Sequence, residues 1–190
     1  MQPNYDTWPA VDPLRYAGFW RRLGALLLDG LILFPISATS MWCFSHYRLF
    51  YLYTLLPMTL FGLFFSVYLV RRYGGTPGKL IAGIRIRKVN GDAIGYREAM
   101  LRYLPECILG ILSSIAMALA ILQMSDAEYL GFTFAERARQ TLLHAPAWER
   151  HVRMIQNVWI WSEFIVMLTN RRRRALHDFI AGTVVVVHQK

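Results

Sequence analysis

The stretch "RRLGALLLDGLILFPISATSMWCF", residues 21–44, decides the fold of this chain. Between Arg22 and His46 the only formal charge is that of Asp29. A helix crosses a bilayer with about 20 residues at a rise of about 1.5 Å each, so this stretch is long enough to span a membrane. The sequence therefore predicts a transmembrane helix at 23–44 that carries a single carboxylate.

Three further apolar stretches follow the first. Residues 49–70 contain no formal charge, 103–124 contain only Glu106, and 154–170 contain only Glu163. Of all 190 residues 55% are apolar and 17% are charged, and these lengths favour membrane spans over a very apolar soluble bundle. The sequence therefore predicts an all-α membrane protein with four transmembrane helices.

The formal charge of +9 is unevenly distributed along the chain. Arg and Lys gather before the first predicted span, within 71–102 and after residue 170. Because loops rich in Arg and Lys stay on the cytoplasmic side, both termini and loop 71–102 are predicted to be cytoplasmic and loop 125–153 external. The excess charge then sets topology and attracts anionic lipid headgroups. Nucleic-acid binding is not predicted, because no base-stacking or groove-reading module accompanies the arginines.

The predicted cytoplasmic regions are an arm at 1–16, loop 71–102 and a tail at 171–190, and the membrane domain covers 17–190. Within "GGTPGKLIAGIRIRKVNGDAIGY", residues 74–96, apolar and basic residues alternate before an Asn-Gly pair. This pattern predicts a β-hairpin with strands near 82–89 and 93–96. The β-branched "TVVVVHQ", 183–189, predicts a third strand. We therefore expect a small cytoplasmic β-element that joins the loop to the tail.

The predicted external loop contains helix signals. Thr133 followed by Glu136 fits a capping box, which predicts a short helix towards His144. Pro146 suits the first turn of a further helix that continues into the fourth predicted span.

No pattern in the chain predicts catalysis. "GGTPGKL" lacks the first Gly of a phosphate-binding P-loop and the Ser or Thr after its Lys, so a tight turn is the better interpretation. The five histidines and two cysteines show no metal-ligand spacing. We therefore predict that the protein is not an enzyme and has neither a cofactor nor a metal site.

Asp29, Glu106 and Glu163 are predicted to converge on the cytoplasmic half of the membrane. Helical rise places them about 10, 6 and 10 Å inside its boundary, counted from Arg22, Arg102 and Asn170. In a structural interpretation, nearby arginines or protonation neutralise them. In a functional interpretation, they bind a cation such as Na⁺ or carry H⁺, and a homo-oligomer supplies the room for an aqueous path. Only the functional interpretation predicts that Asp29→Asn abolishes transport in folded, inserted protein.

Three segments together resemble the RDD family of bacterial membrane proteins. They are "YAGFWRRLGALLLDGLI" at 16–32, "GGTPGKLIAGIRI" at 74–86 and "RRRALHDFIAGTVVV" at 172–186. By this resemblance the family's arginine is Arg22 and its two aspartates are Asp29 and Asp178. The resemblance implies a multi-pass protein of the bacterial cytoplasmic (inner) membrane, in a family of which a few members are linked to sodium/proton exchange.

The resemblance adds Asp178 to the acids near the cytoplasmic boundary. A guanidinium can donate to two carboxylates, so we expect Arg22 to compensate both Asp29 and Asp178. The resulting hypothesis for function is cation- or proton-coupled transport through the acidic cluster. The alternative is a non-transporting membrane scaffold that docks a protein partner. A transporter needs its acids water-accessible and titrating, whereas a scaffold needs them paired and dry.

Overall fold

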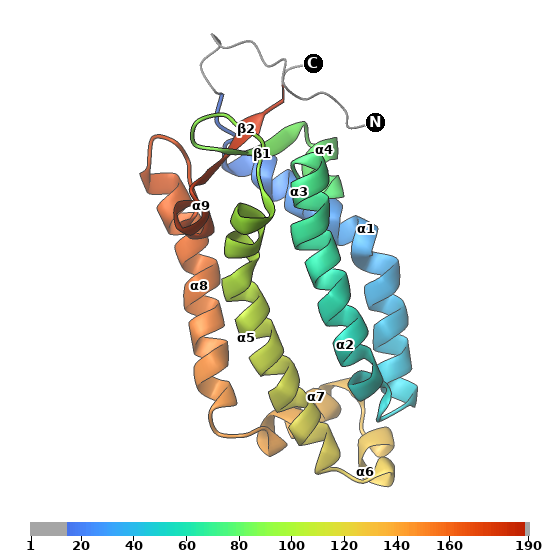
Figure 1. The fold of residues 1–190 in the computed structure, drawn as a ribbon. Coiled ribbons are helices and arrows are strands. Elements are labelled where there is room, and N and C mark those ends of the chain that lie inside the picture. The colour runs from blue at the N-terminus through green and yellow to red at the C-terminus, as the bar shows by residue number, and fades with distance from the viewer. Residues whose placement is uncertain (1–14, 189–190) are drawn as a thin grey trace.

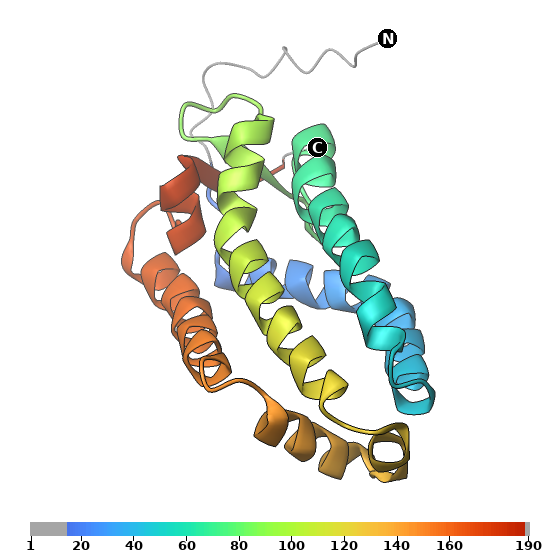
Figure 2. The ribbon, with the colours of Figure 1, turned by 60° about the horizontal axis from the view of Figure 1, so that its bottom comes forward.

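Four long helices form a bundle in the computed structural model, which describes residues 15–188. They are α1 (Phe19–His46), α2 (Phe50–Leu63) with its continuations η1 (Phe64–Tyr68) and α3 (Leu69–Tyr73), α5 (Tyr96–Leu122) and α8 (Glu149–Thr169). The segment η1 is a π-helical turn that joins α2 to α3 without a break. Figures 1 and 2 both place α5 between α2 and α8, so α5 is the central helix.

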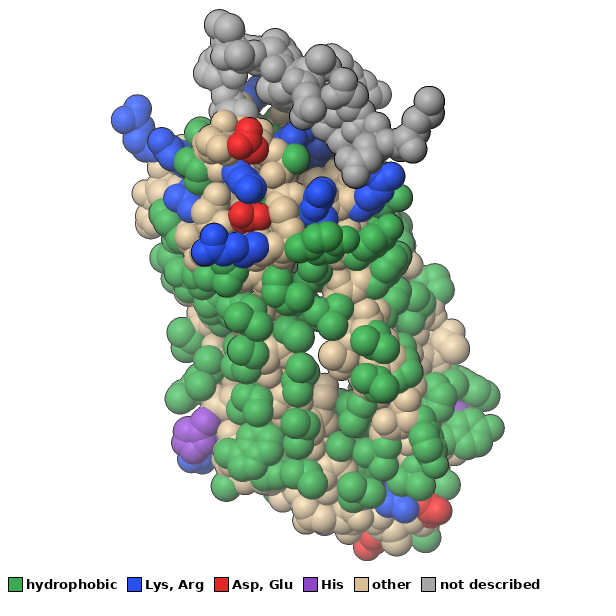
Figure 3. Space-filling view, in the orientation of Figure 1, with side chains coloured by type: hydrophobic (Ala, Val, Ile, Leu, Met, Phe, Trp, Pro, Cys, Tyr) green, Lys and Arg blue, Asp and Glu red, His purple; other side chains and the backbone are tan. Residues whose placement is uncertain are grey.

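Three helical segments of the described chain are long and apolar enough to cross a membrane, namely Phe19–His46, Phe50–Ile81 and Tyr96–Leu122. Their side chains face mainly outward, and Figure 3 shows an apolar belt around the middle of the molecule with Lys and Arg gathered at one end. Helix α8 forms where the fourth span, 154–170, is predicted, but it is less apolar than the other three. Three of the four predicted spans are therefore supported, and the fourth stays a prediction.

A two-stranded antiparallel sheet lies at one end of the bundle, called the sheet end below (Figure 1). Strand β1 (Ile84–Lys88) pairs with β2 (Thr183–Val187) in the register Ile84↔Val187 to Lys88↔Thr183. The predicted third strand is thus confirmed, but the predicted hairpin is wrong. Its second strand, 93–96, is replaced by one isolated bridge at Ala93 and by the start of α5. Strand β2 has four consecutive β-branched valines, whereas 93–96 contains one β-branched residue, Ile94, followed by a glycine.

The chain segment before α1 extends this sheet. Ala17 N donates to Val185 O at 2.8 Å, Val187 N donates to Arg15 O at 2.8 Å, and Tyr16 bridges Val186. Strand β2 is therefore flanked by backbone on both edges. Most of the predicted arm, 1–14, lies outside the described residues, whereas its last part joins the sheet. A core that includes Ile84, Ile86 and Val185 of the sheet packs at this end of the bundle.

Two short helices close the opposite end of the bundle, α6 (Asp126–Gly131) and α7 (Phe134–His144) (Figures 1 and 2). The capping box of Thr133 and Glu136 is confirmed, and α7 ends at His144 as predicted. A second capping box, Ser125 with Glu128, starts α6, a helix that was not predicted. Pro146 precedes α8, which begins at Glu149, so its predicted place in the first turn is wrong.

Candidate functional site

Asp29 of α1 lies buried against the start of the short helix α4 (Pro77–Ile81). Its Oδ1 accepts a hydrogen bond from Gly78 N at 2.7 Å, and its Oδ2 accepts one from Thr76 Oγ1 at 2.5 Å. The first amides of a helix lack partners within the helix and carry partial positive charge, so a carboxylate is stabilised there. A carboxylate from another helix thus caps α4, which explains how a charged group is tolerated inside an apolar stretch.

The close approach of α4 to α1 requires glycine at position 78. A Cβ built on Gly78 would overlap the carbonyl oxygen of Ala25 and lie 2.6 Å from Asp29 N. Both neighbours are backbone atoms of α1, which cannot rotate away as a flexible side chain can. Gly78 therefore serves two functions: it lets α4 reach α1, and its amide donates to Asp29.

We expect Asp29→Asn to lower the free energy of unfolding by about 1–2 kcal/mol, because a charge-assisted helix cap becomes a neutral one. Thermal unfolding of the purified protein in detergent measures this change. The matched control is Asp92→Asn, which makes the same chemical change on an exposed loop and is expected to alter stability by less than about 0.5 kcal/mol. Equal stability of the two variants would contradict the capping function of Asp29.

Asp178 is fully buried in the short helix α9 (Leu176–Ala181) and receives donors from three other parts of the chain. Its Oδ2 accepts from Arg22 Nη1 at 2.8 Å and from Ala175 N at 3.0 Å. Its Oδ1 accepts from Arg102 Nη1 and, at 3.2 Å, from Thr183 Oγ1. One carboxylate thereby connects α1, α5, α9 and β2 at the sheet end.

The electrostatics of this group follow from its two arginines. Burial by itself raises the pKa of the Asp178 carboxyl, but the charges of Arg102 and Arg22 outweigh burial and hold this pKa well below its usual range. Asp178 is therefore ionised at neutral pH. Buried pairs of this kind are costly to break, because removing one partner leaves an uncompensated charge in a poorly solvated place.

His177 connects this centre to Glu163 of α8. Arg102 Nη2 lies 2.7 Å from His177 Nε2, and a guanidinium has only donors, so Nε2 accepts this hydrogen bond. Nδ1 pairs with Glu163 Oε2, and Glu163 Oε1 accepts from the backbone N of His177 at 3.0 Å. Glu163 therefore holds α9 against α8.

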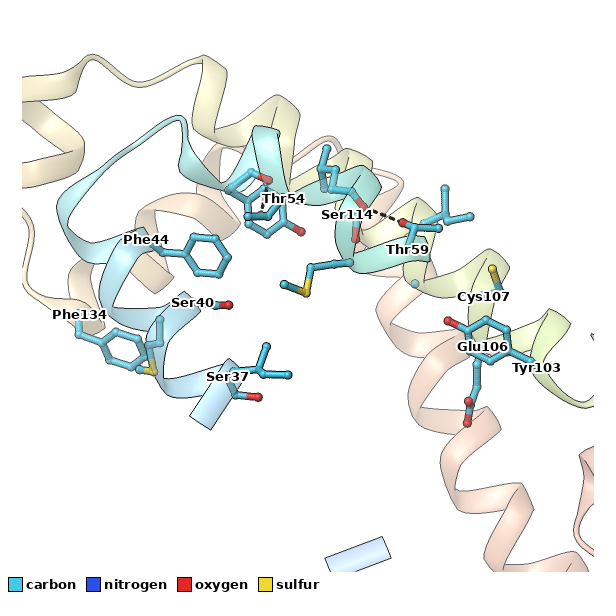
Figure 4. A pocket seen from close by; sticks show the side chains of 17 residues that line it. Ser37, Ser40, Phe44, Thr54, Thr59, Tyr103, Glu106, Cys107, Ser114 and Phe134 are labelled. Carbon is cyan, nitrogen blue, oxygen red and sulfur yellow. Dashed lines mark hydrogen bonds between the residues drawn. The ribbon is translucent and has the colours of Figure 1, made fainter. Parts of the chain in front are cut away.

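Glu106 differs from the other acids. It is exposed on α5, and no hydrogen bond or ion pair from the described residues reaches its carboxylate. It lines a mainly apolar cavity of about 590 Å³ between α1, α2 and α5, where Figure 4 shows it beside Tyr103. It also lines a smaller polar cavity of about 110 Å³. Glu106 and Tyr103 line both cavities and therefore lie between them.

The polar cavity is where the sequence-predicted acids come closest to a common site. Besides Glu106 and Tyr103, its lining consists of Ser66, Val70, Thr76, Lys79, Ile86, Arg102 and His177. Asp29 is one hydrogen bond away through Thr76, and Glu163 is one contact away through His177. Of the three acids of the predicted cluster, Glu106 lines this cavity, whereas Asp29 and Glu163 contact residues of its lining.

One expected interaction is wrong. Arg22 donates to Asp178 and to the carbonyl oxygens of Ala17 and Arg173, and within 15–188 it forms no hydrogen bond or ion pair with Asp29. Seven residues of helix separate Arg22 from Asp29 by about 10 Å along the axis, and Arg22 turns towards the sheet.

Arg102 was expected among the arginines that neutralise the acids, and it pairs with Asp178. The sequence did not predict three further partners, which are Thr76, Lys79 and His177. All three lie inside the segments that carry the family resemblance, and that position was the one available signal. Within residues 15–188, no group of three or more His, Cys, Asp or Glu residues is placed to hold a metal ion.

Long apolar helices and a charged, internally paired sheet end define the class of this molecule as a membrane protein. The chain belongs to the RDD family, whose model matches residues 16–182, and the matched range contains Arg22, Asp29 and Asp178. No curated protein and no solved structure matches the sequence.

Proposed function

We propose that the protein is a transporter that moves a cation or a proton past Glu106. The observation that carries this proposal is that Glu106 is an exposed carboxylate in a membrane-crossing helix, bordering two cavities and unpaired within the described chain. Ionisable groups at such positions are costly in lipid and mark ion or proton pathways. Asp29, Glu163 and Asp178, by contrast, act as structural links.

The proposed orientation follows the charge distribution. The sheet end carries most of the Arg and Lys, and Arg15 and His188, the first and last described residues, both bond to backbone at this end. By the positive-inside rule this end faces the cytoplasm of a bacterial inner membrane. Helix α8 is then the fourth span, stabilised by packing on α5 rather than by hydropathy alone. The polar cavity opens towards the cytoplasm, and the apolar cavity lies deeper in the bilayer.

Lys79 gives the site a means of responding to its occupant. It lines the same polar cavity as Glu106 and interacts with it electrostatically, and its Nζ lies 3.4 Å from Thr76 Oγ1. A cation or proton that reaches Glu106 weakens the attraction between Glu106 and Lys79. Thr76, the residue before α4, also donates to Asp29 of α1, so occupancy of the cavity affects the contact between α1 and α4.

We expect Glu106→Gln to reduce cation-driven proton flux at least tenfold while leaving thermal stability within about 1 kcal/mol, because the carboxylate has no hydrogen bond to lose. The measurement uses proteoliposomes with a pH-sensitive dye inside and pulses of sodium, potassium or lithium outside. Asp92→Asn is the matched control, since it removes one carboxylate from an exposed loop. Asp29→Asn should retain flux per folded molecule.

Two outcomes would contradict the proposal. Flux that persists in Glu106→Gln would exclude the path past this residue. Absence of flux from folded, inserted wild-type protein with all three cations would exclude cation-driven proton exchange and favour a scaffold that docks a protein partner.

A further inference from the structure

A basic groove lies at the sheet end, outside the cavities that border Glu106. It has a volume of about 480 Å³ and is formed by the start of α1, the segment before it and the turn that follows α8. Among the described residues that line it, four are arginines and none is acidic; the arginines are Arg15, Arg21, Arg171 and Arg173. We call this site the arginine groove.

Arg173 is held in this groove by backbone geometry. It is the one non-glycine residue of the described chain with a positive φ, 49°, a conformation that costs energy and persists where the surroundings impose it. Arg22 Nη2 donates to its carbonyl oxygen at 2.6 Å, which ties this turn to the Asp178 centre. Its guanidinium lies over Gly18, where a Cβ would overlap Nη1. The turn therefore presents Arg173 across the N-terminus of α1.

Among the described residues, the four guanidinium groups of the groove have no counter-charge. Within residues 15–188 no carboxylate pairs with any of them, whereas Arg22 and Arg102 both pair with Asp178. The first turn of α1 contains no acidic residue, and no side chain caps it. Like charges held close together repel, and the helix N-terminus adds partial positive charge. A negatively charged group that enters the groove would relieve this repulsion.

The position of the groove identifies the source of that negative charge. Trp20, which lines the groove, is 79% exposed at the beginning of the first membrane-crossing helix. Trp side chains favour the level of lipid headgroups, and basic pockets at the ends of membrane helices bind anionic headgroups. We propose that the arginine groove is a specific site for the phosphate headgroup of an anionic membrane lipid. This site is independent of the proposed path past Glu106.

The test is binding of a short-chain phosphatidylglycerol to the purified full-length protein in a non-ionic detergent, followed by native mass spectrometry and by thermal shift. Saturable binding is expected for phosphatidylglycerol and not for phosphatidylcholine of the same chain length. The double variant Arg21→Gln, Arg171→Gln is expected to weaken binding about tenfold or more. Both residues are exposed, so the variant is expected to fold.

The matched control is Arg72→Gln, Arg97→Gln, which removes two exposed charges outside the groove and should weaken binding less than threefold. Equal binding by wild type and the groove variant would overturn the proposal. Displacement of the lipid by an equal concentration of inorganic phosphate would also overturn it, because the groove would then take phosphate from solution. Because lipid binding and ion flux are measured separately, failure of this proposal is distinguishable from failure of the transport proposal.

Discussion

Replacing Asp178 by Asn is expected to lower the free energy of unfolding by about 3–5 kcal/mol, because two arginines would remain charged with no carboxylate beside them. Arg22 and Arg102 have side chains that are 13% and 9% exposed, so water compensates them poorly. Chemical or thermal unfolding in detergent measures the loss. Asp126→Asn is the matched control, since Asp126 pairs with Arg48 but is 71% exposed, and it should cost less than about 1 kcal/mol. Similar losses of stability in the two variants would contradict the conclusion that Asp178 compensates two buried arginines.

The pH dependence of stability gives a second readout of Asp178. Its pKa in the folded protein lies below the value of about 4 for an unfolded Asp, so its stabilising contribution is complete above about pH 4. As the pH falls below about 4 towards the folded pKa, this contribution is lost. We therefore expect the difference in stability between wild type and Asp178→Asn to be constant from pH 7 to about pH 5 and to shrink below pH 4.

Gly78→Ala is expected to lower the free energy of unfolding by about 2–4 kcal/mol, the second largest effect among these variants. The added Cβ overlaps the backbone of α1, so α4 has to move away, and both hydrogen bonds to Asp29 lengthen or break. Thermal unfolding measures the change. Gly30→Ala is the matched control. It makes the same substitution at an exposed position of α1, where a Cβ has no neighbour within 4 Å. Alanine favours helix there, so stability should stay equal or rise by up to about 1 kcal/mol.

If Gly78→Ala and Gly30→Ala behaved alike, the close approach of α4 to α1 would not determine stability. The same pair of variants tests how the carboxylate of Asp29 is tolerated in an apolar helix. A carboxylate in an apolar helix has to be neutralised, paired or hydrated. Here the donors come from the start of another helix, and their position depends on the absence of a side chain at residue 78.

The contrast between Asp29 and Glu106 changes the interpretation of the predicted acidic cluster. All three acids appear equivalent in the sequence, since each is a single charge in an apolar stretch. In the structure Asp29 and Glu163 accept hydrogen bonds, whereas Glu106 borders two cavities and accepts none from the described residues. Depth in the membrane could be estimated from helical rise, but the presence of donors could not, because they come from distant parts of the chain.

The sequence by itself determined the local features of this protein. Apolar length predicted the three supported membrane-crossing helices, β-branched composition predicted β2, and the capping box of Thr133 and Glu136 predicted α7. Its three resembling segments also predicted the RDD family. The helices, β2 and the capping box each depend on residues that are close together in the chain, so one segment contains the information needed. The family resemblance combines three such segments.

Only the tertiary structure decided which groups meet. Gly78 reaches Asp29 across 49 residues, Arg22 reaches Asp178 across 156, and β1 pairs with β2 rather than with its neighbour in sequence. The energy of these contacts depends on the relative positions of whole helices, and a few ångströms decide whether a carboxylate is paired or exposed. For this reason the carboxylate of Asp29 caps a helix and that of Asp178 is a buried anchor. The carboxylate of Glu106 is unpaired within the described residues.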